Sequence, residues 1–151
     1  MQFNFVSRSP NRTQKLARVL GAELRAIGKK RTHAFCIALS GELGAGKTLF
    51  VKGLARGLGL RGPIQSPTFI IMRRHALKRA GRFQSLWHAD CYRLKKEKEL
   101  TALKFREILK DPQNIVAIEW AERVKKYLPK DTLWIALSHN APTVRAIKLR
   151  S

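Results

Sequence analysis

The sequence predicts an α/β domain of three layers, in which a mostly parallel central sheet with antiparallel additions lies between helices. Two observations carry this prediction. Apolar runs of strand length alternate with segments whose leucines recur at helical spacing, a pattern typical of parallel sheets covered by helices. Between the apolar run 34–39 and one such helical segment lies GELGAGKT, Gly41 to Thr48, which matches the phosphate-binding pattern G-x-x-x-x-G-K-[ST] without a mismatch.

In the N-terminal half, helix-capping residues and apolar runs predict the elements. Ser9 followed by Pro10 predicts a helix start, because Ser caps helices well and Pro fits their first turn; the helix is expected to end near Gly28. The expected elements are a strand at 3–6, a helix from about 10 to 28, a strand at 35–39 and a helix at 47–58.

In the C-terminal half, prolines and polar clusters separate the elements. Pro112 and Pro129 are each expected to end a helical stretch, since Pro cannot continue a helix. The expected elements are a hairpin of strands 68–72 and 83–91 around a polar connection 73–82, one or two helices within 94–109, a buried strand at 115–118, a helix at 121–127, and two strands at 133–138 and 143–149.

Length and composition favour one soluble domain, 1–151. No apolar run approaches a membrane span and the N-terminal segment lacks a secretory signal, so a cytoplasmic protein without membrane association is expected. Cys36 and Cys91 lie far apart in apolar runs, which favours buried free thiols over a zinc site or a disulfide.

The loop carries the most specific chemistry. Its glycines let the backbone turn sharply and approach phosphate oxygens, and the following helix N-terminus favours anions. Lys47 is expected to reach the β- and γ-phosphates of ATP, and the Thr48 hydroxyl to ligate Mg²⁺. A plain turn would explain the glycines but not the Lys-Thr pair. The expected nucleotide contacts are Gly41, Glu42, Leu43, Gly44, Ala45, Gly46, Lys47, Thr48 and Leu49.

Two carboxylates at strand ends could complete a hydrolytic site. Glu119 follows the apolar run 115–118, and Asp90 ends another strand; either could hold Mg²⁺ or position water, although any strand can end in a solvated acid. Ser66 and Thr68 are candidates for a switch that senses the γ-phosphate, or belong to an ordinary turn. The same ambiguity holds for Trp120, which fits the core or the nucleotide pocket, and for His88, which pattern alone favours as a structural residue.

The charge is unusual. There are 31 Lys and Arg residues against 10 Asp and Glu, for a formal net charge of +21, which predicts attraction to polyanions. The denser clusters, at 29–31, 73–82, 93–98 and 123–126, fit either solvated surface or an RNA footprint, and no single basic stripe stands out along the chain.

Taken in order, GELGAGKT, SPTF, HADCYRL and IEWAE resemble the motifs of the TsaE (YjeE) family, over nearly the whole chain. The resemblance implies a P-loop NTPase fold and a weak ATPase activity stimulated by partners. It also implies action with the TsaB–TsaD heterodimer, which transfers threonylcarbamoyl onto an adenosine of tRNA (t6A modification). Ala121 stands where the family usually has proline, and the charge leaves open whether this chain contacts tRNA directly.

Carried onto this sequence, the resemblance assigns Gly41 through Thr48 to phosphates and Mg²⁺, Ser66 and Thr68 to a switch-like loop, and Asp90 to the metal neighbourhood. It makes Glu119 the catalytic acid and places Trp120 against the nucleotide or a partner. Lys47, Glu119 and Asp90 are thus the expected catalytic residues.

Two other functions stay open. A small-molecule kinase uses the same loop but needs an acceptor pocket and an Arg-rich lid, for which 73–82 is the candidate. A basic RNA-binding module with vestigial nucleotide binding would explain the charge. The motifs carry no prediction of oligomeric state.

Overall fold

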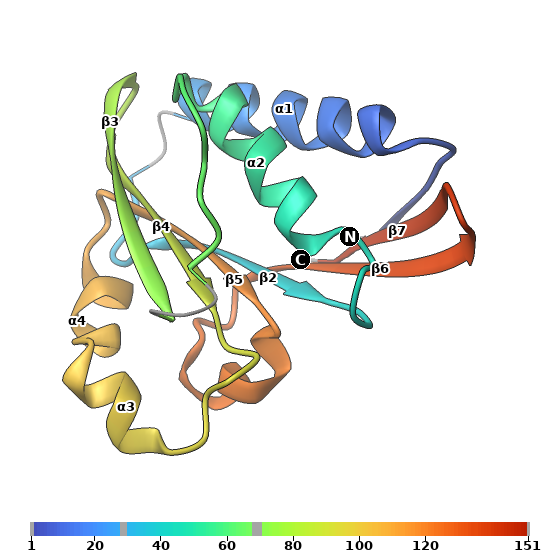
Figure 1. The fold of residues 1–151 in the computed structure, drawn as a ribbon. Coiled ribbons are helices and arrows are strands. Elements are labelled where there is room, and N and C mark those ends of the chain that lie inside the picture. Colours follow the sequence, from blue (N-terminus) through green and yellow to red (C-terminus); the bar gives the residue numbers. More distant parts are fainter. Residues whose placement is uncertain (1, 28–29, 68–70, 151) are drawn as a thin grey trace.

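The computed structural model describes residues 2–27, 30–67 and 71–150. Strands and helices alternate through the first four elements, and consecutive pairs of strands or of helices occur later in the chain (Figure 1). Their bounds are β1 Gln2–Ser7, α1 Pro10–Ala26, β2 Phe35–Ser40, α2 Lys47–Gly57, β3 Met72–Ala80, β4 Phe83–Asp90, α3 Glu97–Ala102, α4 Phe105–Lys110, β5 Asn114–Glu119, η1 Ala121–Tyr127, β6 Leu133–Ala141 and β7 Val144–Arg150.

The strands form one sheet in the order β1-β7-β6-β2-β5-β4-β3. Its centre is parallel, because β2 pairs in parallel with both β5 and β6, and β4 pairs in parallel with β5. The antiparallel pairs are β1 with β7, β6 with β7, and β3 with β4. The predicted fold class, a P-loop NTPase fold with a mostly parallel centre and antiparallel additions, is confirmed.

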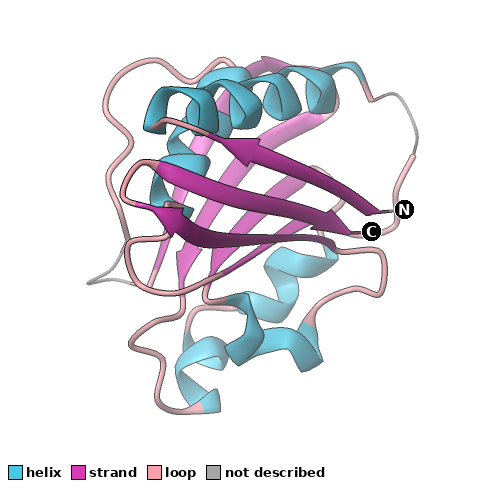
Figure 2. Ribbon diagram, turned by 90° about the vertical axis from the view of Figure 1, so that its right-hand side faces the viewer, coloured by secondary structure: helices cyan, strands magenta, loops and turns pink. Residues whose placement is uncertain are grey.

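Helices cover both faces of this sheet (Figures 1 and 2). The first face packs against α1 and α2, and the second against α3, α4 and η1. Alternation along β2 shows why its sequence is apolar throughout: Ile37 and Leu39 join the first core, whereas Cys36 and Ala38 join the second. Both cysteines are buried and free, as expected, and burial raises the pKa of each to about 12.

The contact between α1 and α2 depends on glycines. A Cβ on Gly57 would lie 2.1 Å from the Arg18 carbonyl oxygen, and one on Gly53 would lie 2.5 Å from that of Gln14. The two helix backbones therefore approach more closely than any side chain at these positions would allow. This close packing also brings the exposed residues of α1 near those of α2.

The predicted start of α1 is confirmed, since the Arg12 amide donates to Ser9 Oγ at 3.3 Å. The helix ends at Ala26, and the expected end at Gly28 lies outside the described residues. The stretch 94–109 forms two short helices, one of the two outcomes expected. Among the described residues, no helix is long and apolar enough to cross a membrane.

One predicted element is wrong in detail. The supposed polar connection 73–82 is mostly strand β3, paired with β4 around a turn at Gly81. Its exposed residues, including Arg74 and Lys78, alternate with the buried Leu77, and cations on an edge strand hinder pairing with other chains. The expected strand start at 68–70 lies outside the described residues. The predicted helix at 121–127 is confirmed, and it is a 3₁₀ helix.

Candidate functional site

The loop Gly41 to Thr48 begins directly after β2, and its last two residues, Lys47 and Thr48, are the first two residues of α2. Gly41, Gly44 and Gly46 have φ of 140°, 76° and 104°, which L side chains rarely adopt. Gly41 meets a second constraint, because a Cβ there would lie 2.2 Å from the Leu137 carbonyl oxygen. The loop is therefore seated against β6 with its backbone amides at the helix N-terminus, the geometry that favours bound phosphate.

Lys47 folds back over this loop. Its Nζ donates to the carbonyl oxygens of Gly41 and Glu42, at 2.6 and 2.9 Å, and lies 3.8 Å from the centroid of the Trp120 ring. The residue is only 4% exposed. Burial lowers the pKa of Lys47 from its ordinary value, and nearby carboxylates, Glu119 foremost, oppose that shift.

Both carboxylate oxygens of Glu119 have hydrogen-bonding partners. The Thr48 hydroxyl donates to Oε2 at 2.8 Å, and His88 Nε2 lies 2.7 Å from Oε1. Because an ionised carboxylate only accepts hydrogen bonds, Nε2 is assigned as the protonated nitrogen of the ring. His88 is fully buried and Glu119 is 3% exposed, so neither side chain can turn freely.

Asp90 lies beside Glu119 because their strands are parallel and in register. Asp90 pairs with Glu119 at the carboxyl ends of β4 and β5. Its Oδ1 accepts a hydrogen bond from the Tyr92 amide at 3.0 Å. The carboxyl ends of parallel strands meet at one edge of a sheet, which is the usual place for ligands in open α/β folds.

These groups open into a pocket of about 410 Å³. Its wall combines the Lys47 ammonium with carboxylates and two aromatic rings, Tyr92 and Trp120, whose centroids are 4.9 Å apart. The lining residues are Leu43, Gly44, Gly46, Lys47, Thr48, Leu49, Asp90, Tyr92, Arg93, Glu119 and Trp120.

Most of the expected site residues thus come together, and the others have identifiable places. Gly41 and Glu42 contact Lys47 through their carbonyls, and the Glu42 carboxylate accepts from the His139 amide at 3.2 Å. The Ala45 carbonyl accepts from Arg145 Nε at 3.2 Å. Ser66 is exposed and does not line the pocket, and Thr68 lies outside the described residues.

The sequence pattern alone favours a structural role for His88, and it does not single out Tyr92 or Arg93. The signal for His88 was present, since strand alternation puts residues 88 and 90 on the same face. Its contact with Glu119 joins two strands whose pairing the sequence does not state. Tyr92 and Arg93 enter the pocket through the chain that follows Asp90.

The donors fit a magnesium ion of the kind that P-loops bind. Within the described ranges, no three His, Cys, Asp or Glu side chains are grouped to hold a metal by themselves. The pocket instead offers oxygen from Thr48, Glu119 and Asp90 beside a phosphate-binding loop. Mg²⁺ prefers this arrangement, because it keeps several waters and takes ligands from substrate phosphates.

Comparisons with known proteins agree on one family. Residues 7–147 match the family described as "Threonylcarbamoyl adenosine biosynthesis protein TsaE". The chain is 37% identical to the TsaE protein of Treponema pallidum over 87% of its own length and 88% of the relative's, and 42% identical to that of Streptomyces coelicolor over 72% of each. The crystal structure of Bacillus subtilis YdiB superposes with a TM-score of 0.73 at 27% identity, covering 99% of this chain and 84% of that one.

Proposed function

This chain belongs to the TsaE family of threonylcarbamoyl adenosine biosynthesis proteins, and we propose that it serves tRNA t6A modification by binding and hydrolysing ATP with Mg²⁺. The observation that carries the proposal is the contact of Glu119 with both Thr48 and His88, directly beside the phosphate-binding loop. A loop that only bound nucleotide would not require a buried carboxylate held at both oxygens.

In the proposed reaction, a water attacks the γ-phosphorus in line with the departing ADP oxygen, the β–γ bridge bond breaks, and phosphate is released. Lys47 leaves the carbonyls of Gly41 and Glu42 to donate to the phosphate oxygens, where negative charge develops. Glu119 orients the attacking water and accepts its proton, and Asp90 lies beside it at the carboxyl ends of the paired strands. Thr48, Asp90 and Glu119 would hold Mg²⁺, which would neutralise charge on the phosphates.

The partner we propose is the TsaB–TsaD heterodimer, and hydrophobic residues at the pocket support an interface there. Leu43 is 73% exposed and Tyr92 is 41% exposed, although both are large hydrophobic side chains that line the nucleotide pocket. A partner that covers them would exclude water from the same site in which Lys47 and Glu119 act. We therefore propose that the partner stimulates a weak intrinsic activity.

The kinase alternative loses its structural support. Its lid candidate, 73–82, is largely hydrogen-bonded within the sheet as β3 and does not extend over the pocket as a separate segment. Hydrolysis therefore remains the function that the site supports best.

The test is steady-state phosphate release from ATP by variants of the loop and of the acid. Lys47→Ala and Glu119→Gln are each expected to lower kcat by at least about 100-fold. Glu119→Gln should still bind ATP, because the loop is intact. Glu107→Gln, an identical change on the exposed surface of α4, is the control and should match wild type. Wild-type turnover by Glu119→Gln would refute the assignment.

A further inference from the structure

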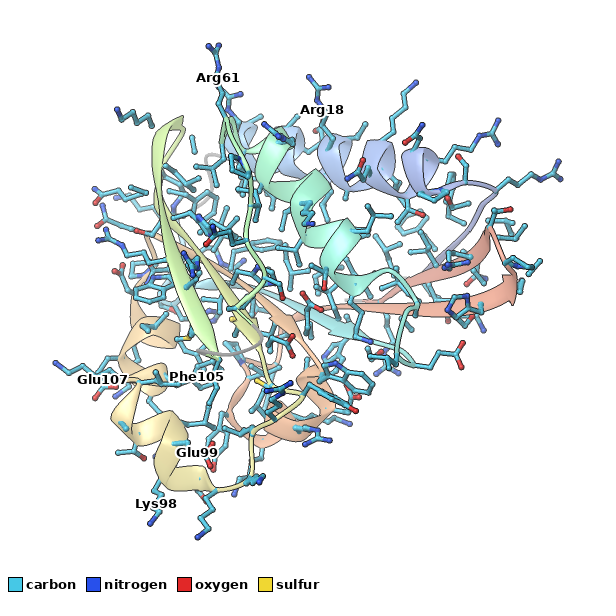
Figure 3. The ribbon with its side chains drawn as sticks, in the orientation of Figure 1. Arg18, Arg61, Lys98, Glu99, Phe105 and Glu107 are labelled. Carbon is cyan, nitrogen blue, oxygen red and sulfur yellow. The ribbon has the colours of Figure 1, made fainter. Side chains whose placement is uncertain are left out.

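A groove of about 1290 Å³ runs along the face of α1 and α2 that is turned away from the sheet, and it continues onto the loop after α2. Six cationic residues from these three segments line it, and no Asp or Glu does. The six are Lys15, Arg18, Arg25, Lys52, Arg56 and Arg61. Figure 3 shows Arg18 and Arg61 projecting from the same side of the molecule, opposite Lys98 on α3.

The absence of Asp and Glu side chains distinguishes this groove from two other pockets of the molecule. The nucleotide pocket contains Asp90 and Glu119, and a third pocket beside η1 contains Glu97 and Asp131. Among the described residues, the ion pairs involve none of the groove cations Lys15, Arg18, Lys52, Arg56 and Arg61. All five are exposed. Their charges thus face solvent without a neutralising side chain.

The fold itself forces these charges together. Close packing at Gly53 and Gly57 brings the row Lys15, Arg18 on α1 beside the row Lys52, Arg56 on α2. Like charges this close repel one another, and a bound polyanion would relieve that repulsion. From Lys15 to Arg25 the row extends for about 15 Å along α1, long enough to follow several phosphates of a nucleic-acid strand.

The residues that line the groove also indicate which part of a nucleic acid they would contact. The groove contains no aromatic side chain on which unpaired bases could stack. It offers only cations and short polar or aliphatic groups, which contact phosphates and follow the shape of a duplex. We propose that this α1–α2 groove is a docking surface for the phosphate backbone of double-helical RNA, and that a tRNA stem is its occupant.

The choice of tRNA rests on the proposed function, whereas the affinity for an RNA duplex rests on the groove alone. No groove residue lines the nucleotide pocket, so the two can be tested separately. Direct contact would let this protein hold tRNA while its nucleotide pocket faces a partner.

The experiment is fluorescence anisotropy with a labelled, unmodified tRNA transcript across a series of salt concentrations. The test variant is the triple change Arg18→Gln, Lys52→Gln and Arg56→Gln. The matched control is Lys98→Gln, Lys104→Gln and Lys110→Gln, exposed cations of α3, its flanking residue and α4, which removes the same charge. Urea unfolding should show that all changed positions leave the fold intact, since each is exposed.

Wild type and control should bind tRNA with a steep salt dependence. The groove variant should bind at least about tenfold more weakly, with the slope of log Kd against log salt reduced by about 2. Equal weakening in both triple variants would overturn the proposal, as would tighter binding to a single-stranded RNA of equal length. Binding to phosphatidylserine vesicles without binding to tRNA would overturn it as well.

ATP turnover separates this proposal from the previous one. The groove variant should hydrolyse ATP like wild type in the absence of tRNA. Lys47→Ala should retain groove-dependent tRNA binding. A protein that binds tRNA through the groove but hydrolyses no ATP would refute the proposed function alone, and an active ATPase without groove-dependent binding would refute the groove alone.

Discussion

At the scale of single residues, the proposed catalytic arrangement is a chain of three side chains from different elements. Thr48 comes from α2, Glu119 from β5 and His88 from β4, and two short contacts join them. Nδ1 of His88 is buried and has no hydrogen-bond partner among the described residues, so Glu119 is the only polar group there that fixes the ring. A buried ring nitrogen without a hydrogen-bond partner costs free energy. The structure tolerates this cost at Nδ1 while Nε2 contacts Glu119, which indicates that the ring is oriented for that contact.

His88 is accordingly expected to act as a positioning residue. Its replacement by Leu should lower kcat for ATP hydrolysis by about 10- to 100-fold with little change in KM, because the phosphate contacts remain while Glu119 loses one support. His88→Gln, whose amide can donate from a similar position, should recover part of the loss. The measurement is kcat and KM for both variants.

An equal loss in His88→Gln and His88→Leu would contradict this role, and so would a change confined to KM. Urea unfolding of both variants checks that the difference does not come from stability.

The sequence predicted the residues of this site better than their connections. Lys47 and Thr48 followed from one continuous motif whose chemistry is local. The contact between His88 and Glu119 joins positions that are far apart in the chain, and it exists only because β4 and β5 are adjacent and in register. Single-sequence patterns carry no strand register, so His88 looked like a structural histidine.

At the scale of elements, the packing of α1 on α2 depends on backbone contact at glycines. Gly57→Ala is expected to destabilise the protein by about 1–3 kcal/mol, because the added Cβ would meet the Arg18 carbonyl oxygen at 2.1 Å. Helix propensity alone would favour Ala by about 1 kcal/mol, so the sign of the effect tests the packing. Urea unfolding followed by circular dichroism measures it.

Val19→Ala provides the comparison on α1, since Val19 is 53% exposed and should change stability by less than about 0.5 kcal/mol. A Gly57→Ala protein at least as stable as wild type would show that the helices are not held in close contact.

Elements with a local signal were predicted well, and β3 shows where that signal fails. The signals for the Ser9 cap and for the apolar strands β2 and β5 each lie in residues that are consecutive in the sequence. In β3 the exposed positions are mostly cationic and the partly buried positions include Arg73 and His75, so apolar alternation is nearly absent. The strand forms because β4 offers it a hydrogen-bonding edge, which is a tertiary effect.

At the scale of the whole molecule, the charge is spread along the chain, and six of its cations are gathered in the α1–α2 groove. The groove cations Lys15, Arg18, Lys52, Arg56 and Arg61 belong to none of the dense basic clusters seen in the sequence. They meet because two helices cross closely and one loop returns beside them. Clustering along a sequence is therefore a poor guide to clustering on this surface, and the three-dimensional arrangement was needed to find it.

The function proposed for the whole molecule is that of an ATPase whose activity depends on its partners in tRNA modification. The measurement that tests this most directly is steady-state ATP hydrolysis by the protein alone and with the TsaB–TsaD heterodimer, with Lys47→Ala as the blank. We expect weak turnover alone, a clear increase with the heterodimer, and loss of both in the mutant. Turnover that is the same with and without the heterodimer would contradict the account.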